Sequence, residues 1–280
     1  MTDGGFAQHW QSMREIFGDP DLGLPPSSSP EADEQYARGV DLLKEGKATE
    51  AKQAFRRADD LGHAGAPREL ANWAVARGDM DLSGEWGQLL NRARERGDGR
   101  AASWLGRATQ GDRALDHLRF ADRSGDPGGS RELGMALMAR GDLAGAEAAF
   151  RRADERGSPS GSLALGLLLR DQRKDLQGAE AAFRRAEQRG HPKGSLNLVD
   201  LYSRRGDSAA ADQARERTLQ LAAKHSTVFP EMQDPDFATY VRKVHGRTAA
   251  PATTASGSGC ALAAVAALAA CALAMSLPFV

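Results

Sequence analysis

Cysteine is almost absent from this 280-residue chain, because its only two cysteines, Cys260 and Cys271, lie near the C-terminus. Residues 1–259 therefore cannot hold a disulfide framework, which fits a reducing compartment. Aromatic residues make up only 6% of the chain, as expected of closely packed helices with charged outer faces. The formal net charge of −1 gives no global attraction to nucleic acid or to an acidic surface.

The sequence also lacks the patterns that carry enzymatic chemistry. It contains no Gly-rich phosphate loop, nucleophile elbow or zinc-protease signature. No two histidines form a short-spaced pair suited to metal ligation; they are dispersed as His9, His63, His117, His191, His225 and His245. His63 and His191 occupy equivalent turns of a repeat, which favours a structural role. We therefore expect no enzyme, no metal and no cofactor.

A repeated segment is the strongest pattern that is present. Residues 141–157 return almost unchanged as residues 176–190, and residues 50–62 form an earlier copy. Degraded copies end at 94–97 and 122–125, so the spacing is roughly 28 to 35 residues, typical of helical hairpins. The sequence predicts six helix pairs, near residues 33–45 and 49–61, 66–77 and 81–96, 100–110 and 112–124, 128–140 and 142–156, 160–171 and 175–189, and 193–205 and 207–224.

The turns and helix faces agree with this arrangement. Gly followed by Asp separates paired helices at 78–79, 111–112, 141–142 and 206–207, where Gly can end one helix and Asp can cap the next. Ala146, Phe150 and Ala153 fall on one face, so we expect the Phe ring to fill the gap between hairpins. Glu147 and Arg151 form a favourable i, i+4 pair on the solvent side.

The motif Ala-x3-Phe-x2-Ala, with Leu-Gly in the preceding helix, resembles a tetratricopeptide repeat. The run 185–192, continuing through Leu196 to Tyr202, is more similar to the Sel-one-like branch of that family. The resemblance covers about residues 32–225 and implies an all-α, right-handed α-solenoid of about six helix-turn-helix repeats. The chain departs from the pattern at 86–87, where Trp-Gly interrupts a second helix, in the short third unit, and at Val199 and Ala214 or Arg215 in the last.

The resemblance further implies that first-helix residues line a concave, partner-binding groove. Carried over by alignment, they include Arg68, Asn72, Val75, Ser103, Arg107, Arg131, Met135, Met138, Leu163, Leu167, Arg170, Asp200 and Arg204. Arginine recurs there, which predicts a peptide of acidic character, since guanidinium groups pair with carboxylates. Alternatively, these arginines only keep the inner face soluble. Arg68 and Asn72 resemble the start of a carboxylate clamp, which Gly128 and Glu132 break.

Both ends of the chain differ from the array at residues 31–226. Within residues 1–30, Phe6, Trp10, Met13 and Phe17 recur at helical spacing before a Pro/Ser linker. This helix either caps the array's apolar end or is a detachable motif that docks on a partner or in the chain's own groove. The first residues lack the pattern of a secretory signal. Residues 227–247 are expected to form a C-terminal capping helix, and residues 248–259 a flexible spacer.

Residues 260–280 form an uncharged run, long enough at 1.5 Å per residue to cross a bilayer of about 30 Å as a C-terminal hydrophobic helix. Basic residues precede the run and no charge follows it, which predicts a single-pass anchor with the repeats in the cytoplasm. Small residues four apart, at 263/267 and 266/270, are compatible with a homodimer through this tail. The alternative is a cytoplasmic protein without an anchor.

The predicted function is therefore a protein–protein interaction scaffold, tethered to a membrane and binding an unidentified peptide or protein. The alternative is a soluble regulatory or nucleic-acid-associated repeat protein. Adjacent arginines at 56–57, 151–152 and 184–185 could suggest nucleic acid, but no aromatic platform accompanies them. We interpret them as a solvated outer face, and no nucleic-acid partner is expected.

Overall fold

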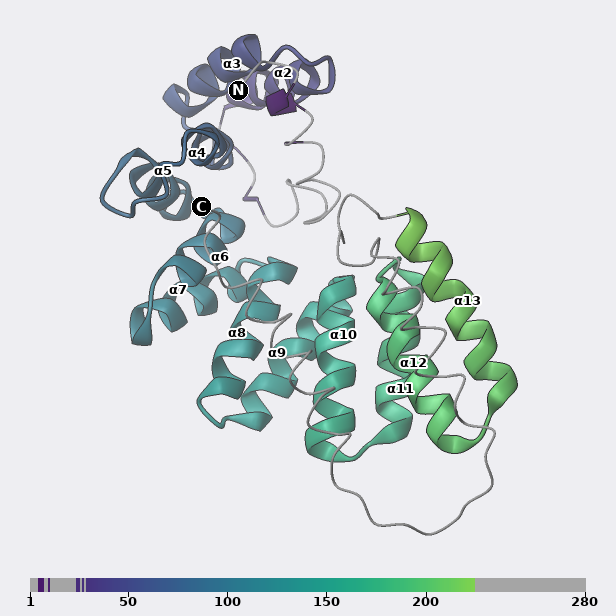
Figure 1. The fold of residues 1–280 in the computed structure, drawn as a ribbon. Helices are drawn as coiled ribbons and strands as arrows, with labels where there is room; N and C mark the ends of the chain where they lie inside the picture. The colour runs from purple at the N-terminus through teal and green to yellow at the C-terminus, as the bar shows by residue number, and fades with distance from the viewer. Residues whose placement is uncertain (1–4, 8–9, 11–23, 26, 28, 225–280) are drawn as a thin grey trace. The chain divides into compact units, whose positions relative to one another are not determined.

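The structure is a computed structural model in which residues 5–7, 10, 24–25, 27 and 29–224 are described. All of them lie in the first of the two units, Met1–His245 and Gly246–Val280, into which the chain divides. Within this part the protein is all-helical and contains no strand, which confirms the all-α prediction (Figure 1).

The six predicted helix pairs are present, and each helix packs against the next along the chain (Figure 1). We call the two members of a pair its first and second helix. The pairs are α2 (Pro30–Lys44) and α3 (Ala48–Asp60), α4 (Ala66–Ala76) and α5 (Glu85–Glu95), α6 (Gly99–Ala108) and α7 (Gly111–Arg123), α8 (Pro127–Ala139) and α9 (Leu143–Glu155), α10 (Pro159–Leu168) and α11 (Leu176–Gln188), and α12 (Pro192–Arg205) and α13 (Ser208–Lys224).

Polar residues placed just before a proline begin four of the first helices, and Ser29 caps α2 in this way by accepting from the N–H of Ala32. Asp126, Ser158 and His191 each accept a hydrogen bond from a backbone N–H in the first turn of α8, α10 and α12, respectively. Proline follows each cap and is suited to the first helical position, because its missing N–H would have no helical acceptor. His191 acts here through its Nδ1 atom, which confirms the structural role predicted for this turn.

The core between paired helices depends on glycine facing phenylalanine. Phe55, Phe150 and Phe183 are at most 1% exposed and lie against Gly39, Gly134 and Gly166, respectively. A Cβ atom added at these glycines would lie only 2.5–2.9 Å from the nearest ring atoms. The last pair departs from this pattern, because the buried Val199 takes the glycine position and the partly buried Arg215 takes the phenylalanine position.

One inserted residue explains an irregular segment after α10. Asp142 lies eight residues after Gly134, whereas Asp175 lies nine after Gly166. The additional residue is absorbed by a π-helical turn, Leu169–Arg173, and by Lys174 with a φ of 57°. As a result Asp175 still caps α11 by accepting from the N–H of Gly178, as Asp142 does for Gly145 in α9.

Two boundaries differ from the sequence-based expectation. α5 begins at Glu85 rather than near residue 81, so Trp86 and Gly87 lie in its first turn and do not interrupt a helix. Gly87 is required there, because a Cβ atom would fall 2.0 Å from the carbonyl oxygen of Leu82. α7 begins at Gly111, so Asp112 lies inside the first turn instead of capping it.

Consecutive second helices are joined by a repeated set of ion pairs, which we call the arginine ladder. Asp122, 8% exposed, accepts hydrogen bonds from Arg152 at 3.0 Å and Arg156 at 2.9 Å, both from the next hairpin. The equivalent rungs are Asp154 with Arg185 and Arg189, Asp59 with Arg92 and Arg96, and Glu187 with Arg217. Arg152 and Arg185, which the sequence analysis assigns to a solvated outer face, are therefore half-buried and bonded to the preceding hairpin.

The first arginines of the predicted pairs do lie at the solvent. Arg151 donates to Glu147 at 2.6 Å, and Arg184 pairs with Glu180 at 2.7 Å, as the i, i+4 spacing predicts. One junction lacks a rung altogether. Arg94 stands where the carboxylate would be, and its guanidinium lies 5.0 Å from the centre of the Phe120 ring, which replaces a ladder arginine.

The right-handed superhelix stays a prediction from the resemblance. The expected capping helix at 227–247, the spacer at 248–259 and the hydrophobic helix at 260–280 all lie outside the described residues. Among the described helices, none is both long and apolar enough to cross a membrane.

Candidate protein-binding surfaces

The predicted groove residues of α4 are buried or half-buried, and not exposed in a groove. Arg68 is 2% exposed; its Nε atom donates to Asp98 Oδ2 at 2.7 Å, and it pairs with Glu69 at 3.0 Å. Burial would lower the pKa of Arg68, but Asp98 and Glu69 raise it well above its usual value. Asn72, half-buried, donates to Glu69 at 3.2 Å. These side chains therefore hold α4 against α6 and do not form a carboxylate clamp. 

Two predicted groove arginines meet at one carboxylate of α8. Arg131 donates to Glu132, and Arg107 of α6 lies 3.9 Å from the same group. Met135, 40% exposed, lies one turn further along α8. Ser103 of α6 is buried and contributes no exposed surface. The structure therefore brings Arg107 and Arg131 together, and the single carboxylate of Glu132 already pairs with both.

A shallow hollow of about 400 Å³ lies beside this cluster. Arg107, Met135, Leu118, Thr109 and Arg140 are among the residues that line it. Its lining comes from the end of α6, from α7 and from α8. Leucine and methionine side chains line it together with Arg107, Glu132 and Arg140.

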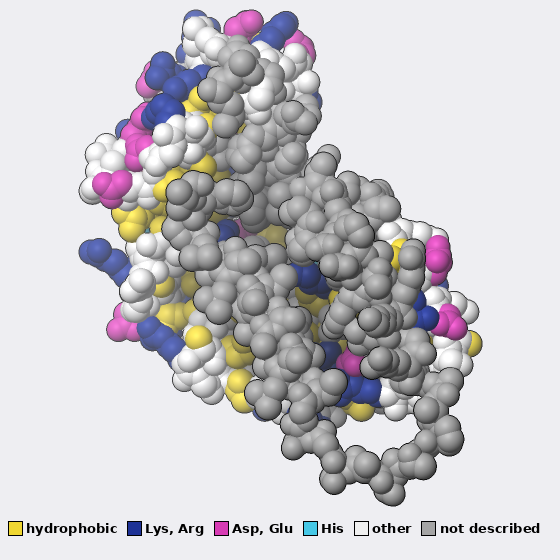
Figure 2. Space-filling view, viewed as in Figure 1, with side chains coloured by type: hydrophobic (Ala, Val, Ile, Leu, Met, Phe, Trp, Pro, Cys, Tyr) yellow, Lys and Arg dark blue, Asp and Glu magenta, His cyan; other side chains and the backbone are white. Residues whose placement is uncertain are grey.

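Further along the array, the predicted apolar patch is half-buried. Met138 of α8 and Leu163 and Leu167 of α10 pack against the same hydrophobic cluster as Leu168. Figure 2 shows hydrophobic side chains along the viewed face, with basic and acidic side chains beside them. These three residues therefore contact one hydrophobic cluster while staying partly exposed, and together with Met135 of α8 we call them the apolar strip.

The remaining predicted arginines are also paired within the chain. Arg170 donates to Asp171 at 2.6 Å and to Asn197 at 2.7 Å, and Arg204 donates to Asp200 at 2.9 Å. The hydrogen bond to Asp171 raises the pKa of Arg170, outweighing its burial. Every predicted groove arginine thus has a carboxylate of its own chain within 4.0 Å: Arg68, Arg107, Arg131, Arg170 and Arg204.

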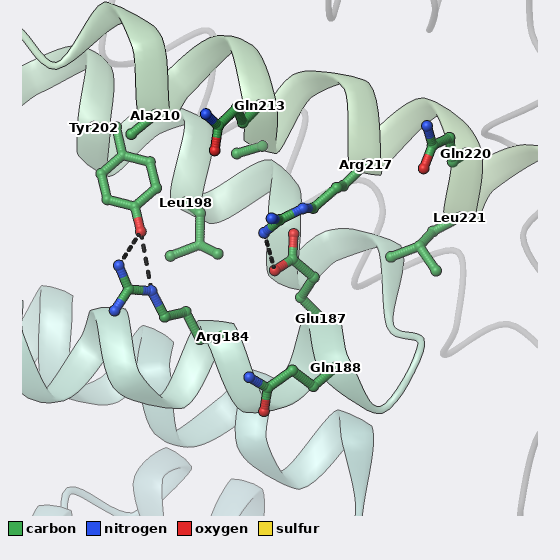
Figure 3. A pocket seen from close by; sticks show the side chains of 11 residues that line it. Arg184, Glu187, Gln188, Leu198, Tyr202, Ala210, Gln213, Arg217, Gln220 and Leu221 are labelled. Carbon is green, nitrogen blue, oxygen red and sulfur yellow. Dashed lines mark hydrogen bonds and ion pairs between the residues drawn. The ribbon is translucent and has the colours of Figure 1, made fainter.

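Sequence reasoning missed a larger pocket of about 770 Å³ between α11, α12 and α13 (Figure 3). Leu198 and Tyr202 of α12 lie between the flanking helices, Arg184 donates to the Tyr202 hydroxyl at 2.9 Å, and Arg217 donates to Glu187 at 3.2 Å (Figure 3). Burial raises the pKa of Tyr202 despite the hydrogen bond from Arg184. 

Two changes in the last repeat give a physical reason for this pocket. Arg215 takes the position of the buried Phe of α3, α9 and α11, and Leu221 takes the position of the second arginine of a ladder rung. The sequence shows the departure at Arg215, but its effect depends on how closely α13 approaches α11. Among the described residues, no group of three or more His, Cys, Asp or Glu side chains could hold a metal ion.

No protein-family model matches the chain, and no curated protein matches it. Solved structures do. An immunity protein from Pseudomonas aeruginosa aligns at 20% identity over 71% of this chain and 84% of its own length, with a TM-score of 0.53. A Sel1 repeat protein from Oxalobacter formigenes aligns at 17% identity over 78% and 95%, respectively, with a TM-score of 0.57.

A protective antigen present in uropathogenic Escherichia coli strains, which displays an SLR fold, aligns at 16% identity over 81% of this chain and 58% of that one, with a TM-score of 0.54. The fold is a helical-repeat fold. This agrees with the Sel-one-like resemblance at the level of architecture, and identities of this size establish the fold alone.

Proposed function

We propose that the protein is a non-enzymatic binding scaffold that takes a protein or peptide partner along the first helices α6, α8 and α10. The observation that supports this most directly is the apolar strip of Met135, Met138, Leu163 and Leu167, which leaves large hydrophobic side chains at least partly exposed on consecutive repeats. Hydrophobic contact supplies the free energy of such recognition, and paired charges at the rim supply its specificity.

The pairing of the groove arginines limits which side chains of a partner they can bind. Arg107 and Arg131 already contact Glu132, so an acidic partner must exchange its own carboxylate for that of Glu132. We therefore propose apolar side chains as the main element of recognition, with acidic groups beside them. A nucleic-acid role gains no support, since the arginines at 151–152 and 184–185 are bonded to carboxylates of the ladder or of their own helix.

A photo-crosslinking amino acid at Met135 or Leu167 should capture the partner in cells, whereas the same group at the exposed Ala148 of α9 should not. Changing Met135→Glu together with Leu167→Glu should reduce capture at least tenfold, because it places charge in the apolar strip. Arg107→Glu with Arg131→Glu should reduce it as well. Capture that is equal at all three positions, or unchanged by both double substitutions, would contradict the proposal.

We also propose that residues 260–280, which lie outside the described residues, tether this scaffold to a membrane. The support is the uncharged sequence of the tail and the basic residues before it. Tethering would raise the local concentration of a captured partner without any new contact.

Deleting residues 258–280 should move the protein from the membrane fraction, where it resists carbonate extraction, to the supernatant. The repeats should remain folded, since the deleted residues lie far in sequence from α13, and circular dichroism checks this. If the intact chain is already found in the supernatant, the proposed anchor is wrong. The alternative, a cytoplasmic scaffold, would then stand.

A further inference from the structure

The N-terminal residues that the structure describes pack onto α4. Phe6 and Trp10 are each only 3% exposed. The Phe6 ring stacks on the Trp73 indole, with 4.2 Å between ring centres and 17° between planes. The Trp10 Nε1–H donates to Glu69 Oε2 at 2.9 Å. This segment therefore contacts the first-helix side of the second repeat through both stacking and a buried hydrogen bond.

The surface of α4 beneath the segment is held in place by other residues. Glu69 is 1% exposed and is fixed by Arg68 and Asn72. Behind Trp73, the Phe55 ring lies at 6.0 Å. Because these contacts do not involve Phe6 or Trp10, the indole and the carboxylate would keep their positions without the segment. A rigid site of this kind loses little conformational entropy on binding.

The contacting residues have the same sequence spacing in the N-terminal segment and in α4. Phe6 and Trp10 are four residues apart and share one face of a helical turn. Their contacts, Trp73 and Glu69, are also four residues apart, on α4. The recognised pattern is thus an aromatic ring at one position and an indole N–H four residues later. Large aromatic side chains that bury this much surface are the usual anchors of protein interfaces.

The sequence allows the segment to leave this site. Residues 25–30 read Pro-Pro-Ser-Ser-Ser-Pro, a linker composition, and join the segment to α2. Release would expose Trp73, which stays half-buried even with Phe6 stacked on it. Trp104 of α6 is also half-buried against the same hydrophobic cluster as Trp73.

We propose that the α4 surface formed by Glu69 and Trp73 is a recognition site for an amphipathic helix with Phe and Trp four residues apart, and that the chain's own N-terminus occupies it until a partner helix of that chemistry replaces it. This inference rests on the proposed protein-binding function. It extends the binding surface by one repeat and gives the partner a defined side-chain pattern.

The test uses a fluorescent peptide of residues 3–19 and the full-length protein. The peptide should bind Phe6→Ala/Trp10→Ala protein at least tenfold more tightly than wild-type protein, because the internal competitor is weakened. A peptide carrying Trp10→Phe keeps an aromatic ring but loses the N–H, and should bind about tenfold more weakly than the parent peptide. Adding Trp73→Ala to the protein variant should abolish binding.

A second measurement needs no substitution, in case the double variant fails to fold. Saturating peptide should speed amide hydrogen exchange of residues 5–10 in the wild-type chain, because it displaces them. Equal affinity for wild-type and variant proteins, or no exchange effect together with no binding, would overturn the proposal. If the wild-type protein is a dimer and the Phe6→Ala/Trp10→Ala substitutions dissociate it, the proposal that the segment binds its own chain is wrong. The segment would then bind α4 of a second copy.

This experiment separates the inference from the proposed function. If crosslinking at Met135 stays position-dependent but the peptide fails to bind, only the α4 site is contradicted. Loss of crosslinking specificity with intact peptide binding would contradict binding along the apolar strip on α8 and α10 and leave the α4 site supported.

Discussion

Replacing Phe183 with alanine should lower the free energy of unfolding by about 3–5 kcal/mol, one of the two largest effects we expect from a single substitution. The ring is fully buried between α10 and α11 and lies directly against Gly166. Its removal leaves a cavity that neither helix can close without separating from its other neighbours. Urea denaturation followed by circular dichroism measures the change.

A double-mutant cycle tests the reason for this effect. Gly166→Ala alone should cost about 1–3 kcal/mol, because its Cβ atom would lie 2.5 Å from the Phe183 ring. Combined with Phe183→Ala, the added methyl group occupies vacated space, so the double variant should be more stable than the sum of the single changes predicts. In the last repeat the larger Val199 takes the glycine position where Arg215, and no Phe, takes the phenylalanine position.

The control for this cycle is Leu176→Ala, at the start of the same helix. Leu176 is 47% exposed, so its replacement should change stability by no more than about 0.5 kcal/mol. Strict additivity of Gly166→Ala and Phe183→Ala would contradict the account of the core as a matched glycine–phenylalanine contact.

Replacing Asp154 with alanine should cost about 2–3 kcal/mol at neutral pH, through loss of one ladder rung. The carboxylate accepts from Arg185 at 2.8 Å, Arg189 at 2.6 Å and the buried Ser162 hydroxyl at 2.7 Å. The effect is smaller than for a fully buried ion pair, because water reaches both guanidinium groups. Glu155→Ala, one residue later and exposed, is the matched control.

The contribution of this rung should depend on pH in a defined direction. Burial acts to raise the pKa of Asp154, but hydrogen bonds from Arg185, Ser162 and Arg189 outweigh it and lower the pKa below its usual value. A folded-state pKa below the unfolded value of about 3.9 stabilises the protein above that pH and loses its effect as pH falls through the folded pKa.

We therefore expect wild-type and Asp154→Asn proteins to differ in stability at pH 6 and to converge as pH falls from about 4 to 2. Urea denaturation at several pH values measures this difference. A stability difference that is the same at pH 6 and pH 2.5 would show that the ionised carboxylate does not carry the effect. Asp122, whose pKa is lowered by Arg152 and Ser130 against its burial, should behave in the same way.

The number and order of the helix pairs could be predicted from the sequence, because each repeat carries its own stop and start residues. Ala146, Phe150 and Ala153 gave the buried face of α9 correctly. The extra residue before Asp175 could also be counted in the sequence. That it forms a π-helical turn could not be predicted, because this depends on how α10 packs against α11.

The candidate site was less predictable, because pairing between side chains depends on distances across repeats. Arg68 was expected at the groove surface, yet Asp98 of the next hairpin holds it inside. Arg152 and Arg185 were read as solvated, since their carboxylate partners lie about thirty residues earlier in the chain. An acid in one repeat, with arginines two residues before and two residues after the equivalent position of the next repeat, could have indicated the ladder.

The junction of Arg94 with Phe120 has a consequence for how such a chain can be rearranged. The carboxylate and its two arginines are replaced together at this one place, by a cation and a ring 5.0 Å apart. Excising α6 and α7 would bring Arg94 opposite Arg152 and Arg156, three cations with no counter-charge. The hairpins, although nearly identical in shape, are therefore not interchangeable parts, and the order in which they stack is written into their outer contacts.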